Sequence, residues 1–165
     1  MSSADSYKIR CGACRARNRI PADKVGQEAK CGKCGNAIDT RVLINARPVL
    51  VSDGDFEEKV LKSPLPTLLY CWASWCPGCK QTTPIIDGFA ADARGRARVA
   101  KLNVDTNPMT AAKYDVRSVP YMFIFDNGQM RENLPAVASK HDLMMIMGRY
   151  ICCRTRRPKT PWRRP

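Results

Sequence analysis

Apolar and polar residues are arranged along the chain in a way that predicts strands and helices in turn. Residues 67–72 are almost all apolar, which is typical of a central strand that is buried on both faces of a sheet. The turn Asp126-Asn127-Gly128 predicts a hairpin, because these residue types favour tight turns. Further strands are predicted at residues 49–51, 99–104 and 121–125, and a weaker one near Met130.

Helix-start signals lie between these strands. Residues 52–55 and 139–142 resemble capping boxes, in which side chains at the start of a helix bond the free amide groups there. Pro84 lies about two turns into the helix that should begin at Cys76, and it predicts a kink. Helices are predicted at residues 56–62, from Cys76 onward, at 108–113 and from Ser139 onward. Helices that alternate with strands, followed by a hairpin, indicate an α/β fold with a mixed sheet.

The junction between the strand at 67–72 and the next helix carries the motif Cys76-Pro77-Gly78-Cys79. Two thiols at this spacing can close a disulfide and reopen it, and a helix N-terminus lowers the pKa of the first thiol. Pro77 suits the first helical position, because a helix makes no use of an N–H there. The motif predicts a redox-active dithiol with Cys76 as a solvent-accessible N-cap and Cys79 facing inward.

Two further Cys-x-x-Cys pairs, separated by sixteen residues, lie near the N-terminus. This spacing is typical of a four-thiolate zinc module, and a complete tetrahedron of ligands makes such a zinc structural. Gly12, Gly32 and Gly35 can adopt the positive φ values that aim backbone N–H groups at sulfur. Two local disulfides are the alternative, which a reducing compartment disfavours. The predicted zinc ligands are Cys11, Cys14, Cys31 and Cys34.

The net charge of +13 is unevenly spread and helps to divide the chain. Residues 1–45 carry nine Lys and Arg against four acids, residues 46–150 thirteen against eleven, and residues 151–165 six against none. The first part is the predicted zinc module, which is too short for a core without metal, and the second is the α/β domain. The third is a basic tail that we expect to be disordered. It could contact nucleic acid or an acidic partner, but a solvated end is the favoured interpretation.

The N-terminus and the nine cysteines indicate where the protein works. Residues 1–8 contain no apolar run behind a basic stretch, so no secretory signal is expected. No segment approaches the roughly twenty apolar residues that a membrane span needs. Nine cysteines without export indicate cytoplasmic metal and redox chemistry rather than a disulfide scaffold.

Several motifs, taken in order, resemble the thioredoxin family. They are Trp72-Ala73-Ser74-Trp75 before the dithiol, Pro84 after it, Lys101-Leu102-Asn103-Val104-Asp105 and Ser118-Val119-Pro120-Tyr121. The N-terminal cysteine pairs, with Asn18-Arg19-Ile20-Pro21 between them, resemble the extension of the bacterial thioredoxin 2 subfamily. The resemblance implies a thioredoxin fold, a mixed sheet flanked by helices, behind a small zinc-ribbon-like module. It also implies a general reductase of protein disulfides, recharged by the NADPH-dependent flavoenzyme thioredoxin reductase.

The resemblance also implies roles by position. Cys76 resembles the attacking thiol and Cys79 the resolving thiol of the family. Val119-Pro120 resembles the cis-proline segment that faces the sulfurs, where an extended substrate strand pairs with the backbone. Trp75 resembles the exposed indole beside the disulfide. Ala136 stands where the family has a glycine in the loop after the hairpin, which should narrow the substrate groove.

Other positions match the family less closely. Trp72 and Asp105 resemble its buried tryptophan and the carboxylate that bonds to that tryptophan. Tyr70 stands where the family has a buried aspartate that relays a proton to the resolving thiol, so Lys101 is expected to lack a carboxylate partner. Pro77-Gly78 reverses the usual order of the two residues between the cysteines. These departures predict slower release of the reduced product and a more oxidising couple than in relatives.

The sequence thus predicts a thiol-disulfide oxidoreductase that reduces protein disulfides and carries one structural zinc. It should be a monomer without a membrane or nucleic-acid partner. A close alternative is a protein of the same fold that mainly oxidises or isomerises protein disulfides. The other alternative is a zinc-module protein that binds nucleic acid or an acidic partner, with a vestigial redox domain. The adjacent Cys152 and Cys153 are interpreted as an exposed, oxidisable pair.

Overall fold

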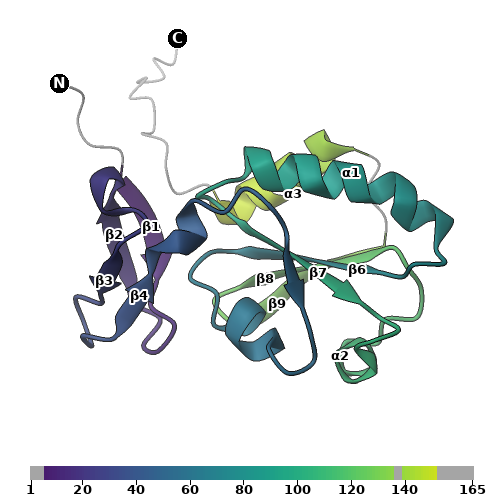
Figure 1. Ribbon diagram of the computed structural model, residues 1–165, viewed down its shortest axis with the longest axis horizontal. Coiled ribbons are helices and arrows are strands. Elements are labelled where there is room, and N and C mark those ends of the chain that lie inside the picture. Colours follow the sequence, from purple (N-terminus) through teal and green to yellow (C-terminus); the bar gives the residue numbers. More distant parts are fainter. Residues whose placement is uncertain (1–5, 136–138, 152–165) are drawn as a thin grey trace, which may run out of the picture.

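The computed structural model describes residues 6–135 and 139–151, which form a five-stranded sheet covered by helices and a small module beside it (Figure 1). The order of the strands is β5-β7-β6-β8-β9, with β5 and β6 parallel to β7, β8 antiparallel to β6, and β9 antiparallel to β8. The strands are β5 Val49–Val51, β6 Thr67–Trp72, β7 Arg98–Asn103, β8 Tyr121–Asp126 and β9 Gln129–Leu134.

The central strand β6 is buried on both faces, as its apolar sequence predicts. Leu68 and Tyr70 pack on one side of the sheet, and Leu69 and Cys71 pack on the other. This alternation follows from the pleat of a strand, in which successive side chains point to opposite faces.

Helices cover each face of the sheet (Figure 1). α1 Pro77–Asp92 and α3 Lys140–Ile151 pack on the side of Tyr70, where they bury Phe89 and Met147. A π-helix η3 Glu57–Leu61 and the short α2 Pro108–Lys113 lie on the other side. There the rings of Phe56 and Tyr114 lie 5.2 Å apart, which closes the second core layer.

The predicted elements of this domain are confirmed, with two local differences. The predicted helix at residues 56–62 has the hydrogen-bonding pattern of a π-helix, and the amide of Lys62 donates to the Glu57 carbonyl at 2.7 Å. At the start of α3 one half of the predicted capping box forms, in which the Ser139 hydroxyl accepts the Asp142 amide at 3.2 Å. At residues 52–55 one half forms, in which the Asp55 carboxylate accepts the Ser52 amide at 2.8 Å.

The N-terminal module consists of two small antiparallel hairpins, which the sequence analysis did not predict. Each hairpin carries one Cys-x-x-Cys pair at its turn, so the two pairs can meet. Ile9, Ile20 and Leu43 form a core of their own with two of the cysteines. The elements are β1 Ser6–Arg10, β2 Arg17–Pro21, η1 Ala22–Lys24, β3 Glu28–Lys30, β4 Ala37–Asp39 and η2 Thr40–Leu43.

The module is fixed to one end of the sheet. The Arg10 amide donates to the Pro64 carbonyl at 2.9 Å, and the Arg15 guanidinium donates to the Leu61 carbonyl at 2.7 Å. Arg10 also pairs with Asp126 at the end of β8. Pro64 precedes β6, and Asp126 is the last residue of β8, which runs antiparallel to β6. These contacts therefore lie at the end of the sheet where β6 begins. Cys76 follows the other end of β6, and the module is therefore remote from the dithiol (Figure 1).

Within the described ranges, no helix is long and apolar enough to cross a membrane. The predicted basic tail, with Cys152 and Cys153, lies outside the described residues except for Ile151, and so does Ala136.

Candidate functional site

The dithiol lies at the junction between β6 and α1, where the sequence places it. Cys76 is the N-cap of α1, Pro77 is the first helical residue, and the Cys79 amide donates to the Cys76 Sγ at 3.1 Å. The two cysteines form a disulfide, with their Cα atoms 5.3 Å apart. Backbone amides and the helix dipole at an N-cap stabilise a sulfur in its thiolate form.

Both cysteines are buried, with 3% of Cys76 and 2% of Cys79 exposed. Cys79 faces inward as predicted, but Cys76 is less accessible in the disulfide form than the sequence analysis expected. The cis peptide bond between Val119 and Pro120 borders the pair, and the Val119 carbonyl lies 3.4 Å from the Cys76 Sγ. A Cβ added to Gly78 would lie 3.3 Å from Pro120 Cδ, so the glycine leaves room for this close approach.

Trp75 lies beside the disulfide and is 66% exposed, as predicted. Its indole Nε1 donates to both carboxylate oxygens of Asp105, at 3.1 and 3.2 Å. The expectation that Asp105 bonds to Trp72 is therefore wrong. Trp72 is partly buried, and its Nε1 has no hydrogen-bond partner among the residues that the structure describes. The carboxylate thus orients the exposed indole at the mouth of the site.

Tyr70 lies behind the inner cysteine and is fully buried. Its hydroxyl donates to the Cys79 carbonyl at 3.1 Å and lies 3.4 Å from the Thr83 hydroxyl. Burial raises the pKa of the Tyr70 phenol, and the hydroxyl of Thr83 partly opposes this shift. Tyr70 therefore stays protonated near neutrality, and it supplies a hydrogen-bond donor where a carboxylate would supply a base.

Lys101 lies on β7 directly opposite Tyr70. Its ammonium group pairs with Asp87 of α1 at 2.5 Å, so the expectation that it has no carboxylate partner is wrong. Sequence reasoning missed both Asp87 and Thr83. A signal was present, because Cys79, Thr83 and Asp87 recur every four residues, which puts them on one face of a helix.

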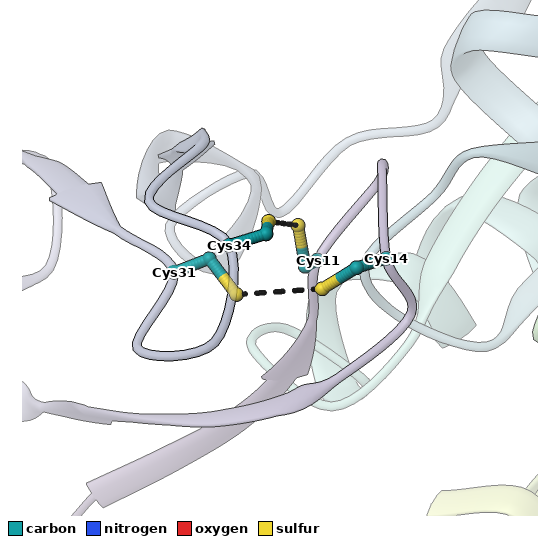
Figure 2. Close-up of side chains that lie close together, drawn as sticks. All are labelled: Cys11, Cys14, Cys31 and Cys34. Atoms are coloured by element: carbon teal, nitrogen blue, oxygen red, sulfur yellow. Dashed lines mark hydrogen bonds between the residues drawn. The ribbon is translucent and has the colours of Figure 1, made fainter.

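The second site is the cluster of four cysteines in the N-terminal module (Figure 2). Their sulfur atoms all lie within 4.8 Å of one another, and the pairs Cys11–Cys34 and Cys14–Cys31 are each 3.6 Å apart. A tetrahedron of zinc–sulfur bonds of about 2.3 Å has edges of about 3.8 Å. The four sulfurs therefore fit one zinc ion with no position left for water or substrate.

Backbone amides beside Cys31 favour its thiolate, the form that binds zinc. The amides of Cys34 and Lys33 lower the pKa of Cys31 to about 6, and the Asn18 side chain also donates to its sulfur at 3.5 Å. Gly35 has the expected positive φ of 74°, whereas Gly12 and Gly32 do not. In the first half-site the left-handed residue is Arg15, with a φ of 60°. Sequence reasoning missed it, because a non-glycine residue seldom adopts this conformation.

An N-capping cysteine that closes a disulfide with a buried partner, beside a cis-proline, defines a thiol-disulfide redox protein. The chain belongs to the thioredoxin family, because the family model described as Thioredoxin matches residues 47–149. A second model, described as Thioredoxin 2, N-terminal, matches residues 10–36. The module is thus a zinc ribbon, and its four cysteines form the site of one structural zinc.

Curated relatives agree with this assignment. The chain is 39% identical over 101 residues to "Thioredoxin" of Rickettsia conorii, which is 61% of this chain and 96% of that protein. It is 39% identical over 101 residues to "Thioredoxin" of a Synechocystis species, 61% of this chain and 94% of the relative. It is 35% identical over 119 residues to "Thioredoxin M-type, chloroplastic" of Pisum sativum, 69% of each chain. The protein is therefore a thiol-disulfide oxidoreductase that acts on disulfide-bearing substrates.

Proposed function

We propose that Cys76 attacks the substrate disulfide and that Cys79 resolves the intermediate. This assignment rests on one hydrogen bond, which the Cys79 amide donates to the Cys76 sulfur at the start of α1. Only Cys76 receives this stabilisation as a thiolate, and the Val119 carbonyl lies next to the same sulfur. Cys79 lies one turn further into the helix, with Tyr70 behind it.

The reaction consists of two exchanges between a thiolate and a disulfide. The Cys76 thiolate attacks one substrate sulfur, forms a mixed disulfide and releases the other substrate sulfur as a thiolate. Cys79 then loses its proton to water and attacks the Cys76 sulfur. This forms the Cys76–Cys79 disulfide and releases the second substrate thiolate, so that the substrate gains the two electrons that the protein loses.

The surface around Cys76 suits an extended substrate segment. We assign substrate binding to Trp75, Val119 and Pro120, and shaping of the site to Pro77 and Gly78. The exposed indole of Trp75 supplies apolar area, and the backbone of Val119 lies beside the reacting sulfur. Gly78 lets Pro120 approach the first turn of α1. We assign supporting roles to Asp105, which orients the Trp75 indole, and to Trp72 and Lys101.

Reduced protein must be regenerated for turnover. We propose that an NADPH-dependent thioredoxin reductase supplies the two electrons and that the exchange takes place in the cytoplasm, where the zinc thiolates stay reduced. The zinc supplies folding free energy and takes no part in the exchange, which agrees with the remote position of the module. The division into residues 1–45, 46–150 and 151–165 is part of the proposal. The matches at 10–36 and 47–149 support it.

The test is the reduction of insulin by the zinc-loaded full chain with NADPH and thioredoxin reductase. The parent should consume NADPH, the Cys76→Ser variant should be inactive, and the Cys79→Ser variant should trap a mixed disulfide through Cys76. A mixed disulfide trapped through Cys79 in the Cys76→Ser variant would overturn the assignment of roles. Absence of NADPH-dependent turnover would overturn the proposed reductase partner.

The predictions of a monomer and of no nucleic-acid partner need a separate measurement. Sedimentation should give the mass of one chain. Titration with single-stranded DNA should show no binding at 0.15 M salt. A tight complex with a steep dependence on salt would instead favour the binding-protein alternative, because release of counterions gives such a slope.

A further inference from the structure

Cys79 is held at both of its backbone polar groups. Its amide donates to the Cys76 sulfur at 3.1 Å. Its carbonyl accepts the Tyr70 hydroxyl at 3.1 Å and the Thr83 hydroxyl at 2.8 Å. The peptide groups that carry the inner cysteine are therefore fixed by contacts from the nucleophile on one side and from two hydroxyl groups on the other.

Tyr70 is well placed to hold this carbonyl still. Tyr70 lies in the middle of β6, and its ring is fully buried between α1 and the sheet. The ring belongs to the same packed cluster as Leu68, Ile86 and Met122. A hydroxyl in such an apolar layer needs a hydrogen-bond partner, because an unpaired one loses its hydration without compensation. The partner is the Cys79 carbonyl, so the bond ties the first turn of α1 to the central strand.

The first turns of α1 need such support. Pro84 lies inside the helix and has no N–H to donate to the Lys80 carbonyl, so the helix lacks one bond of its own ladder. Thr83 and Tyr70 compensate one residue earlier, at the Cys79 carbonyl. A bond from a buried strand restrains the turn more than the helix ladder alone could.

We propose that Tyr70 is a positioning residue for the resolving step, and that its hydroxyl holds Cys79 where the inner sulfur can attack the Cys76 sulfur of the mixed disulfide. This inference rests on the roles proposed above for the two cysteines. Tyr70 acts through the Cys79 carbonyl and transfers no proton. The nearest acid along α1, Asp87, is paired with Lys101.

Position matters in this step because the attack is intramolecular. The Cys79 sulfur must approach in line with the bond that breaks, between the Cys76 sulfur and the leaving sulfur. Correct placement accounts for much of the rate of such reactions, and small displacements are costly. Loss of the Tyr70 hydroxyl should therefore slow the second exchange and leave the first, which uses Cys76 alone, almost unchanged.

The test uses 5,5′-dithiobis(2-nitrobenzoate) as the disulfide, with zinc-loaded, reduced full chain. The first thionitrobenzoate is released when Cys76 attacks, and the second when Cys79 displaces it from the mixed disulfide. Stopped-flow absorbance separates the two phases, and the trace of Cys76→Ser is subtracted to remove other thiols. In Tyr70→Phe the second phase should be about tenfold slower, with the first changed by less than about twofold.

Thr83→Val removes the other hydroxyl from the same carbonyl and should slow the second phase by a smaller factor. Tyr150→Phe is the matched control. The Tyr150 hydroxyl donates to Glu132 of β9 and not to the Cys79 carbonyl, so its loss should change neither phase.

An unchanged ratio of the two phases in both Tyr70→Phe and Thr83→Val would overturn the inference, and so would equal slowing of both phases. If Tyr70→Phe does not fold, the phase ratio of Thr83→Val decides. A parent that releases no second thionitrobenzoate would instead count against the proposed role of Cys79.

Discussion

Gly95 lies in the turn between α1 and β7, against the zinc module. Its φ is 73°, and a Cβ added there would lie 2.7 Å from Tyr7 Cε1 and 3.2 Å from the Leu43 carbonyl oxygen. Both of these atoms belong to the module. The glycine therefore allows the module to pack closely on the domain, and Gly95→Ala should disturb this packing.

The expected cost has two parts. A left-handed backbone costs a residue with a Cβ about 1–2 kcal/mol. Forcing a methyl group into occupied space costs a further 1–3 kcal/mol or so. The sum, about 2–5 kcal/mol, is a large share of the roughly 5–15 kcal/mol that stabilises an ordinary domain.

Urea unfolding of the zinc-loaded chain measures this cost as a shift of the midpoint at constant slope. Two other glycines provide matched controls. Gly26 has a φ of 89° but only Ile44 Cδ1 at 3.9 Å, so Gly26→Ala should cost the backbone share alone. Gly148 lies in α3 with no atom within 4 Å of an added Cβ, so Gly148→Ala should stabilise by about 1 kcal/mol.

A second measurement isolates the contact with the module. In a Tyr7→Ala background the methyl group of Gly95→Ala meets no ring, and its cost should fall toward that of Gly26→Ala. The reasoning is refuted if Gly95→Ala and Gly26→Ala cost the same in the parent, because the module would then not be held against Gly95.

Three further results are expected. Asp87→Ala should destabilise by about 1–3 kcal/mol, because it leaves the Lys101 ammonium buried without its carboxylate, whereas Lys101→Met should cost less than about 1 kcal/mol; equal costs in urea unfolding would contradict this. Burial raises the pKa of the Cys71 thiol to about 12 from its ordinary 9.0. The contribution of the buried, neutral thiol to the free energy of unfolding is therefore complete below pH 9 and is lost as the pH rises toward 12. The unfolding midpoint should therefore fall more steeply above pH 9 in the parent than in Cys71→Ala, and parallel curves would show that this thiol does not contribute. Metal analysis should find one zinc per chain in the parent and none in Cys31→Ser, since three thiolates leave the tetrahedron incomplete; zinc retained by the variant would exclude Cys31 as a ligand.

The elements that sequence predicted well are those with local causes. The strand β6 follows from its run of apolar residues, and the start of α1 follows from Cys76 and Pro77, which suit an N-cap and a first turn. The turn at Asn127 and Gly128 follows from residues that tolerate positive φ.

Contacts between distant segments could not be predicted in this way. Asp53 accepts the amides of Met109 and Thr110 at 3.1 and 2.8 Å and so caps α2 from another part of the chain. Nothing near Asp53 in the sequence marks this role, because the partner is brought there by the packing of the whole domain. The same holds for Arg15, which reaches the Leu61 carbonyl only because the module sits at the end of the sheet.

The region behind the dithiol shows why a change at one buried position is hard to interpret from sequence. With Tyr70 in place of a carboxylate, the sequence predicts a Lys101 ammonium without a carboxylate partner. The fold supplies the acid from α1, where Asp87 lies two helical turns beyond Cys79 and stays half exposed. The ammonium thus turns toward α1, which leaves the space beneath Cys79 to a neutral hydroxyl. The inner sulfur is thus left with position rather than a base to assist it.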